Sequence, residues 1–152
     1  MVNMTNQYYC TIIEFGTPEF DQALRIRYRV LKKPLNLDFD PEDIANEYDS
    51  FHLACYDSLT DEMAAILVLK PLDTKALKMR QVAVDQSYQS KKVGSFLISE
   101  SEKLAVAKGY NKIELHARDT AVEFYVKAGY SILGDVFQEV GINHFFMYKN
   151  LS

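Results

Sequence analysis

The chain has 152 residues, of which 48% are hydrophobic and 25% charged, and its formal net charge is −4. This composition predicts one soluble domain over residues 1–152 with a single hydrophobic core, and the acidic balance without a basic stripe argues against a nucleic-acid binder. The first residues, MVNMTNQYY, do not resemble a secretion signal, and the longest apolar run, 63–69, is too short to span a bilayer. We therefore expect a cytoplasmic protein that binds no membrane and keeps its two cysteines, Cys10 and Cys55, reduced.

The first third of the chain predicts one strand and two helices. Residues 8–15 are rich in β-branched and aromatic side chains, which is typical of a strand. A helix is expected over 17–31, because Thr17 can cap it and Pro18 would occupy its first position. The same order of cap and proline recurs in DPED and predicts a short helix over 40–48.

The middle of the chain predicts a hairpin and then a strand that leads into a long helix. Strands 51–57 and 63–72 are separated only by the polar stretch DSLTDE, which favours a hairpin. A third strand, 79–85, continues through the turn YQSKKVG into a helix that ends at Lys108, before Gly109.

The last third predicts a strand over 111–117 and a short helix over 120–130, in which Thr120 and Glu123 have the spacing of a capping box. Two more strands are expected, over 131–137 and 143–151. The whole order predicts a mixed, mostly antiparallel α/β sheet of about seven strands flanked by helices. The unit from 79 to 117 requires a right-handed parallel crossover, and such sheets bind ligands beyond the carboxyl ends of their strands, beside helix N-termini.

The turn YQSKKVG lies at such a place, and its lysines need an explanation. Cations at a helix N-terminus are unfavourable by about 0.3–1 kcal/mol each, whereas the free backbone N–H groups there bind anions. Lys91 and Lys92 are therefore explained by a ligand with several negative charges, such as a pyrophosphate, which Gly94 would allow to approach closely. From these residues alone, an ordinary surface turn with solvated lysines is the alternative.

This turn and a later segment resemble the GNAT superfamily of acyltransferases. Gln89 and Gly94 match the first and last positions of the family's coenzyme A motif, Gln/Arg-x-x-Gly-x-Gly/Ala, whereas Lys92 replaces its middle glycine. The segment RDTAVEFYVKAGY is similar to the family's second motif through Phe124, Tyr125, Gly129 and Tyr130. The resemblance covers almost the whole chain and is strongest to small bacterial N-acyltransferases.

The resemblance implies a GNAT-like acyl-CoA N-acyltransferase fold and transfer of an acetyl group from acetyl-CoA to a primary amine of a small molecule or peptide, by direct attack in a ternary complex. It implies that two strands splay apart to admit the pantetheine arm, which backbone groups of Val82, Ala83 and Val84 would bind. The pyrophosphate would be held by the turn, at Gln89, Ser90, Lys91, Lys92, Val93, Gly94 and Ser95. No metal is expected, and a homodimer stays open.

For catalysis, the resemblance places the hydroxyl of Tyr125 near the thioester sulfur as a general acid; from the residues alone, Tyr125 is a packed aromatic. The amine must lose a proton, and the strand before the turn offers no carboxylate between Lys78 and Val84. The candidate bases are therefore His52, His116 and His144, with a water relay as the alternative. Neither cysteine has the surroundings of a nucleophile.

Residues 37–49, LDFDPEDIANEYD, contain six carboxylates. They predict either an acidic wall that favours a cationic amine or a solvated loop, and the arginines of the first helix, Arg25, Arg27 and Arg29, could neutralise them. Two other functions stay open. One is a non-catalytic acyl-CoA-binding module of the same fold. The other is a general nucleotide-binding domain, although the chain has no P-loop or complete dinucleotide fingerprint.

Overall fold

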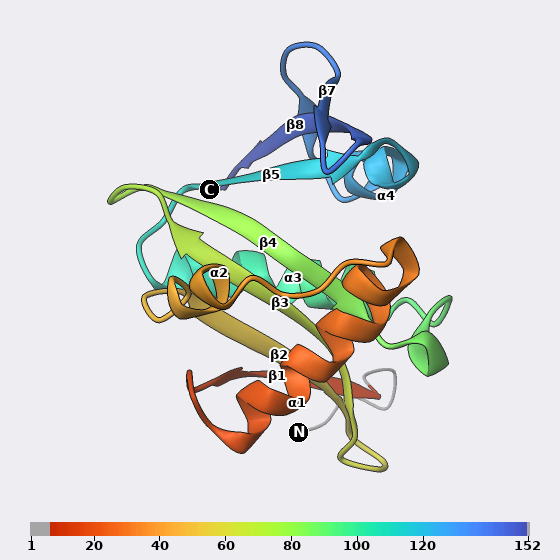
Figure 1. The fold of residues 1–152 in the computed structure, drawn as a ribbon. Coiled ribbons are helices and arrows are strands. Elements are labelled where there is room, and N and C mark those ends of the chain that lie inside the picture. Colours follow the sequence, from red (N-terminus) through yellow and green to blue (C-terminus); the bar gives the residue numbers. More distant parts are fainter. Residues whose placement is uncertain (1–6, 152) are drawn as a thin grey trace.

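The computed structural model describes residues 7–151 (Figure 1), so most of the stretch judged not to be a secretion signal, residues 1–6, lies outside it. The strands are β1 Tyr8–Ile13, β2 Phe51–Asp57, β3 Met63–Pro71, β4 Ala76–Val84, β5 Lys112–Arg118, β6 Ser131–Ile132, β7 Phe137–Glu139 and β8 Ile142–Asn150. They form one sheet in the order β1-β2-β3-β4-β5-β8-β6, with β7 paired to β8. Within the described part, β4 and β5 are the parallel pair and the other pairs are antiparallel, which confirms the predicted mixed, mostly antiparallel sheet.

The α-helices are α1 Pro18–Arg27, α2 Pro41–Ala45, α3 Val93–Ala107 and α4 Val122–Lys127. The predicted caps of the first two are confirmed, because Thr17 accepts a hydrogen bond from the Phe20 amide and Asp40 accepts one from the Glu42 amide. After Arg27 the chain continues as a π-helical turn over Tyr28–Lys32 and a 3-10 turn over Lys33–Leu35. The predicted helix over 17–31 is therefore present, but its last turn is wider than an α-helix.

Two local expectations near the C-terminus were wrong. The capping box does not form, because a 3-10 turn over Asp119–Ala121 precedes α4, and Asp119 accepts the hydrogen bond from the Thr120 amide instead. The single strand expected over 131–137 is divided into β6 and β7, since Gly134, with φ +85°, turns the chain between them. This division gives the sheet eight strands instead of about seven.

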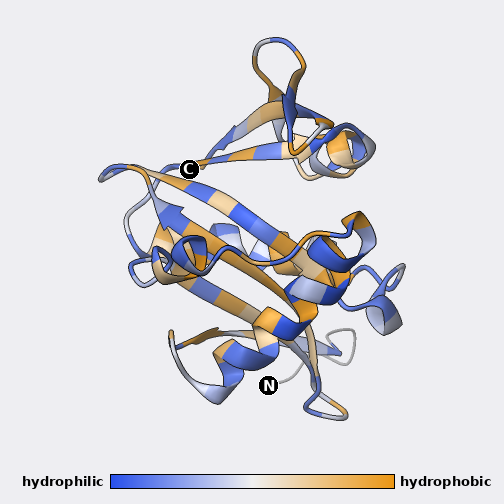
Figure 2. Ribbon diagram, viewed as in Figure 1, coloured by the Kyte–Doolittle hydropathy of each residue, from blue (hydrophilic) through white to orange (hydrophobic). Residues whose placement is uncertain are grey.

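Hydrophobic residues pack on both faces of the sheet, so the expected single core is divided into two clusters. On one face, Leu97 and Ile98 of α3 pack with Tyr125 of α4. On the other, Ala23 and Ile26 of α1 pack against the strands. Strand β3, which lies between the two clusters, is largely apolar. Figure 2 shows the hydrophobic residues gathered along the central strands.

The sheet opens between β4 and β5. Their hydrogen-bonded register runs from Ala76–Lys112 to Met79–Leu115 and stops there, although β4 continues to Val84 and β5 to Arg118. The two strands diverge visibly in Figure 1. This is the splay that the resemblance implied.

A bulge in β4 accompanies this opening. Arg80 pairs with Val68 and Ala83 with Ile66, so Gln81 and Val82 share one partner position, and Gln81 has a φ of +56°. Bulges of this kind redirect a strand and leave a backbone group unpaired. The bulge therefore lies at the place where β4 leaves β5.

Candidate active site

A cavity of about 420 Å³ lies where β4 ends and α3 and α4 begin. It is lined by Val82, Val84, Tyr88, Gln89, Ser90, Lys92, Val93, Gly94, Ser95, Ala121, Phe124 and Tyr125. The sequence-predicted cofactor residues all line it except Ala83 and Lys91. Ala83 instead packs in the cluster on the α1 face. The structure thus brings the turn and Tyr125 together in one cavity.

The N-terminus of α3 offers unpaired amides to this cavity. Its cap residue, Lys92, forms no side-chain cap, and the first turn contains no acidic residue. The first backbone bond of the helix runs from the Phe96 amide to the Lys92 carbonyl, 3.2 Å away, so the three preceding amides have no partner within the helix. These amides belong to Val93, Gly94 and Ser95. Together with the helix dipole they suit an anion.

The two lysines precede the helix rather than standing in its first turn, and they lie in different places. The Nζ atom of Lys91 lies 5.7 Å from the centre of the Tyr88 ring. Lys92 lines the cavity and has a left-handed backbone, with φ +63°. This conformation costs a residue other than glycine roughly 1–2 kcal/mol. Lys92 therefore combines backbone strain with a positive charge at the cavity.

The turn is held firmly by its own side chains. The Tyr88 hydroxyl lies 3.0 Å from Asp57 Oδ2 and 2.9 Å from Glu62 Oε2, both at the β2–β3 hairpin. Gln89 Nε2 donates to the Val84 carbonyl at 3.1 Å. Since these bonds fix the turn from both sides, its amides are oriented before any ligand binds.

Gly94 has a packing reason that the sequence did not reveal. A Cβ atom at this position would lie 3.3 Å from the Phe124 ring and 3.7 Å from the Val84 side chain. The absent side chain therefore lets α3 approach α4 closely. Close approach of a ligand is not needed to explain this glycine.

Tyr125 is buried in α4, with its ring near those of Phe124 and Tyr130. Burial raises the pKa of Tyr125 to about 12, and no charged neighbour contributes. The phenol is therefore protonated throughout the neutral range, which a proton donor requires.

The three candidate bases divide into two groups. His52 is buried, its Nε2 lies 2.9 Å from the Glu47 carbonyl oxygen, and its ring packs against Phe15 and Phe20. Burial lowers the pKa of His52. These contacts make it a structural residue.

His116 and His144 instead meet at Glu139, a residue that the sequence analysis did not select. Glu139 lies in a region where the sequence predicts a loop around Gly141. In the structure this region is a short hairpin of β7 and β8.

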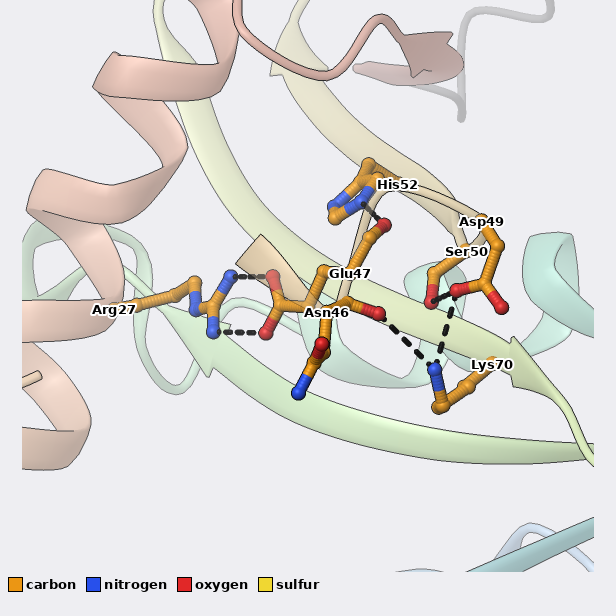
Figure 3. A network of polar contacts seen from close by, with 7 residues as sticks. All are labelled: Arg27, Asn46, Glu47, Asp49, Ser50, His52 and Lys70. Atoms are coloured by element: carbon orange, nitrogen blue, oxygen red, sulfur yellow. Dashed lines mark hydrogen bonds and ion pairs between the residues drawn. The ribbon is translucent and has the colours of Figure 1, made fainter. Parts of the chain in front are cut away.

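The acidic segment 37–49 is largely engaged in internal contacts, of which Figure 3 shows those of Glu47 and Asp49. Both Glu47 carboxylate oxygens lie 2.7 Å from the Arg27 guanidinium, and each of these side chains is only 2% exposed. Asp49 pairs with Lys70 at 3.1 Å. Asp38 and Asp40 accept hydrogen bonds from neighbouring backbone amides. The segment is therefore not a free acidic wall facing a substrate.

The cysteines, far apart in the sequence, are direct neighbours in the β1–β2 register. The hydrogen bond to Cys55, together with burial, raises the pKa of the Cys10 thiol, which agrees with the expectation that neither cysteine is a nucleophile. No helix within residues 7–151 is long and apolar enough to cross a membrane.

Comparison with known proteins bears on the family and the fold. The model of the acetyltransferase (GNAT) domain matches residues 41–151. YitI of Bacillus subtilis (strain 168), an uncharacterized N-acetyltransferase, is 30% identical in an alignment of 145 residues that covers 92% of this chain and 97% of YitI.

Two solved structures are similar over nearly their whole length. A proposed N-acetyltransferase from Lactobacillus plantarum has a TM-score of 0.85 at 22% identity and covers 97% of this chain and 100% of its own. A GNAT family acetyltransferase from Elizabethkingia anophelis, with acetyl-CoA bound, has a TM-score of 0.73 at 20% identity and covers 96% and 99%. They confirm the acyl-CoA N-acyltransferase fold.

Proposed function

Because the chain belongs to the GNAT acetyltransferase family, we propose that it transfers an acetyl group from acetyl-CoA to a primary amine by direct attack in a ternary complex. The observation that supports this most is the cavity at the split of β4 and β5, where unpaired helix amides and a buried phenol meet. Acetyl-CoA, when bound, supplies the thioester, and the residues of this chain bind, orient and protonate.

The cavity suits the diphosphate and pantetheine parts of the molecule. The α3 amides and Lys92 would bind the pyrophosphate, and the backbone of β4 at Val82–Val84 would bind the pantetheine amides in the split. A second hollow of about 280 Å³ between α3 and α4 contains Ser99, Lys127 and Lys149 and shares Ser95 and Phe124 with the first. This neighbouring hollow is a suitable place for the adenosine end.

Tyr125 would donate the proton that the departing sulfur needs. In the reaction a nitrogen–carbon bond forms, the carbon–sulfur bond breaks, the amine loses a proton and the sulfur gains one. A pKa of about 12 makes the phenol a weak acid, but a thiolate formed in the same buried surroundings is also made more basic by desolvation. Burial thus makes the phenol a weaker proton donor and the thiolate a stronger proton acceptor. These effects oppose each other, so a buried Tyr125 can still donate the proton.

A second function, an acyl-CoA-binding module without catalysis, is favoured by one observation. Lys92 adopts a left-handed conformation where the family motif has glycine, and it is one of the residues that line the cavity. Binding would then persist while turnover is absent. A small-molecule or peptide acceptor and a cytoplasmic location stay predictions.

Thermal unfolding with coenzyme A and with dephospho-coenzyme A tests the cofactor assignment. Both should raise the melting temperature, because the shared pyrophosphate is the part that the helix amides bind. No shift with either at saturating concentration would refute the assignment.

Release of free thiol from acetyl-CoA with a panel of primary amines separates the enzyme from the binding module. Turnover with at least one amine supports acetyl transfer. Coenzyme A binding without any turnover supports the module.

A further inference from the structure

We propose that His116 accepts the proton from the incoming amine and that Glu139 holds it in position, an inference that rests on the proposed acetyl transfer. The two residues come from β5 and β7, on the sheet face opposite α3. His144 of β8 completes the cluster.

The position of His116 is set by the opening of the sheet. Leu115 is the last residue of β5 paired with β4, so His116 is the first residue of β5 in the region where the two strands diverge. Leu115 and Ala117 are buried in the cluster on the α3 face, and strand side chains alternate, so His116 lies on the other face. A thioester reaching through the split from the α3 side would therefore meet His116 on the far side.

The geometry leaves one nitrogen of His116 free to act. Its Nδ1 lies 3.1 Å from Glu139 Oε1, and an ionised carboxylate can only accept, so Nδ1 donates. In neutral imidazole the lone pair is then on Nε2. The His116 side chain is 28% exposed, and its ring lies near those of Phe137 and Phe146, at centroid distances of 5.0 and 6.1 Å. An oriented, accessible and unprotonated nitrogen is what a base must provide.

His144 has a different place in the cluster. Its Nδ1 lies 2.8 Å from the Ile142 carbonyl oxygen, and its Nε2 lies 3.6 Å from Glu139 Oε2. The side chain is only 6% exposed and stacks on Phe137. The buried His144 therefore makes little contact with solvent or a substrate, and its Nδ1 donates to the Ile142 carbonyl, so it packs beside Glu139 without a hydrogen bond to it. We assign Glu139 as the positioning residue.

The proton transfer balances without any further reactant. A free alkyl amine, with a pKa near ~10.4, is mostly protonated at neutral pH, so it must lose a proton before or as the nitrogen–carbon bond forms. His116 takes that proton at Nε2 and releases it to solvent through its exposed edge. The arrangement of the His and Glu side chains in the described chain does not form a group that could hold a metal ion.

Several other charges surround this proton acceptor. Lys78 and Arg80 come from β4, and Glu114 and Arg118 share its face of β5. Electrostatic influence of Glu139 and Glu114 reaches Lys78, so the two strands and β7 form one charged surface. Of these charged groups, Glu139 is the one in direct contact with His116.

The test measures kcat/KM against pH for His116→Asn, Glu139→Gln and Glu139→Asp, with the panel amine that the wild type acetylates fastest. His116→Asn should lower kcat/KM by about 10²–10⁴-fold. It should also remove the decrease in kcat/KM that the wild type shows at acidic pH. Its coenzyme A affinity should stay within about twofold. Glu139→Gln should lower kcat/KM by a smaller factor and shift the pH at which kcat/KM decreases on the acidic side. Glu139→Asp should retain more of the wild-type kcat/KM than Glu139→Gln.

Glu114→Gln is the matched control, since Glu114 shares the strand and face of His116 but pairs with Lys112 at 3.1 Å. It should keep the wild-type profile. Wild-type rate and an unchanged acid limb in His116→Asn would overturn the proposal. If the wild type binds coenzyme A but acetylates no amine, the proposed function itself fails and this proposal with it.

A second measurement applies if His116→Asn does not fold. The chain has 3 histidines, so their ring signals can be followed individually by NMR in the wild type. Adding the amine to the coenzyme A complex should shift the His116 ring signal and leave that of buried His52 in place. An unmoved His116 signal at a saturating amine concentration would contradict the proposal.

Discussion

Replacing Tyr125 by Phe removes one hydroxyl and keeps the aromatic ring. The ring is buried near Phe124 and Tyr130, and burial alone raises the pKa of the hydroxyl to about 12. Since no partner is left unpaired by its removal, we expect the free energy of unfolding to change by less than about 1 kcal/mol. Coenzyme A affinity should likewise stay within a few-fold.

The effect on turnover should be much larger than the effect on folding. General acid catalysis contributes about 10²–10⁴-fold, which corresponds to about 2.7–5.4 kcal/mol at 1.36 kcal/mol per decade. We therefore expect kcat to fall by that factor, measured as thiol released from acetyl-CoA at a saturating amine concentration. Because a hydroxyl with a pKa of about 12 is protonated throughout the usual assay range, Tyr125 should add no basic limb to the wild-type profile near neutrality.

Tyr130→Phe is the matched control. Tyr130 is also buried, its ring lies 5.8 Å from that of Tyr125, and it does not line the cavity. This variant should keep the wild-type kcat. Near-normal turnover by Tyr125→Phe would show that Tyr125 is a packing residue. A collapse of coenzyme A binding in the same variant would show that the hydroxyl shapes the cavity, and the argument for a proton donor would be refuted.

Three further predictions concern charge and strain. Lys92→Gly relieves a left-handed residue and should raise the melting temperature slightly; if the Lys92 charge assists binding, coenzyme A affinity should fall and its salt dependence should flatten, whereas tighter binding would mean that the side chain only crowds the cavity. Glu47→Gln leaves the buried Arg27 guanidinium without its negatively charged partner and should cost about 3–5 kcal/mol in urea unfolding. The double variant Arg27→Met with Glu47→Leu should recover much of that loss, and a cost below about 1 kcal/mol for the single change would contradict the reasoning. Burial lowers the pKa of His52, so its stabilising contribution is complete above the unfolded value of about 6.5 and is lost as the pH falls through the folded value; His52→Asn should make stability depend less on pH in that acid range, and an identical pH dependence would exclude His52 as the cause.

Much of the fold was determined by local sequence signals. Cap residues followed by proline predicted where α1 and α2 begin, and Gly109 predicted the end of α3, because caps and left-handed glycines act within a few residues. Hydrophobic alternation located most strands for the same reason. The coenzyme A motif then led to the turn that, with Tyr125, lines the main cavity.

Pairings between distant residues were decided only by the tertiary structure. In the sequence, nothing distinguishes Glu47 from the other five acidic residues of segment 37–49. In the structure, the packing of α1 against the loop after α2 buries Glu47 with Arg27. His116 and His144 were separate candidates until the hairpin of β7 and β8 brought Glu139 between them. Local propensity acts over a few residues, whereas these contacts depend on strand order and register, which the global packing of apolar faces selects. The sequence therefore determined where the elements and the cofactor turn lie, and the register of the folded sheet decided which charged side chains meet.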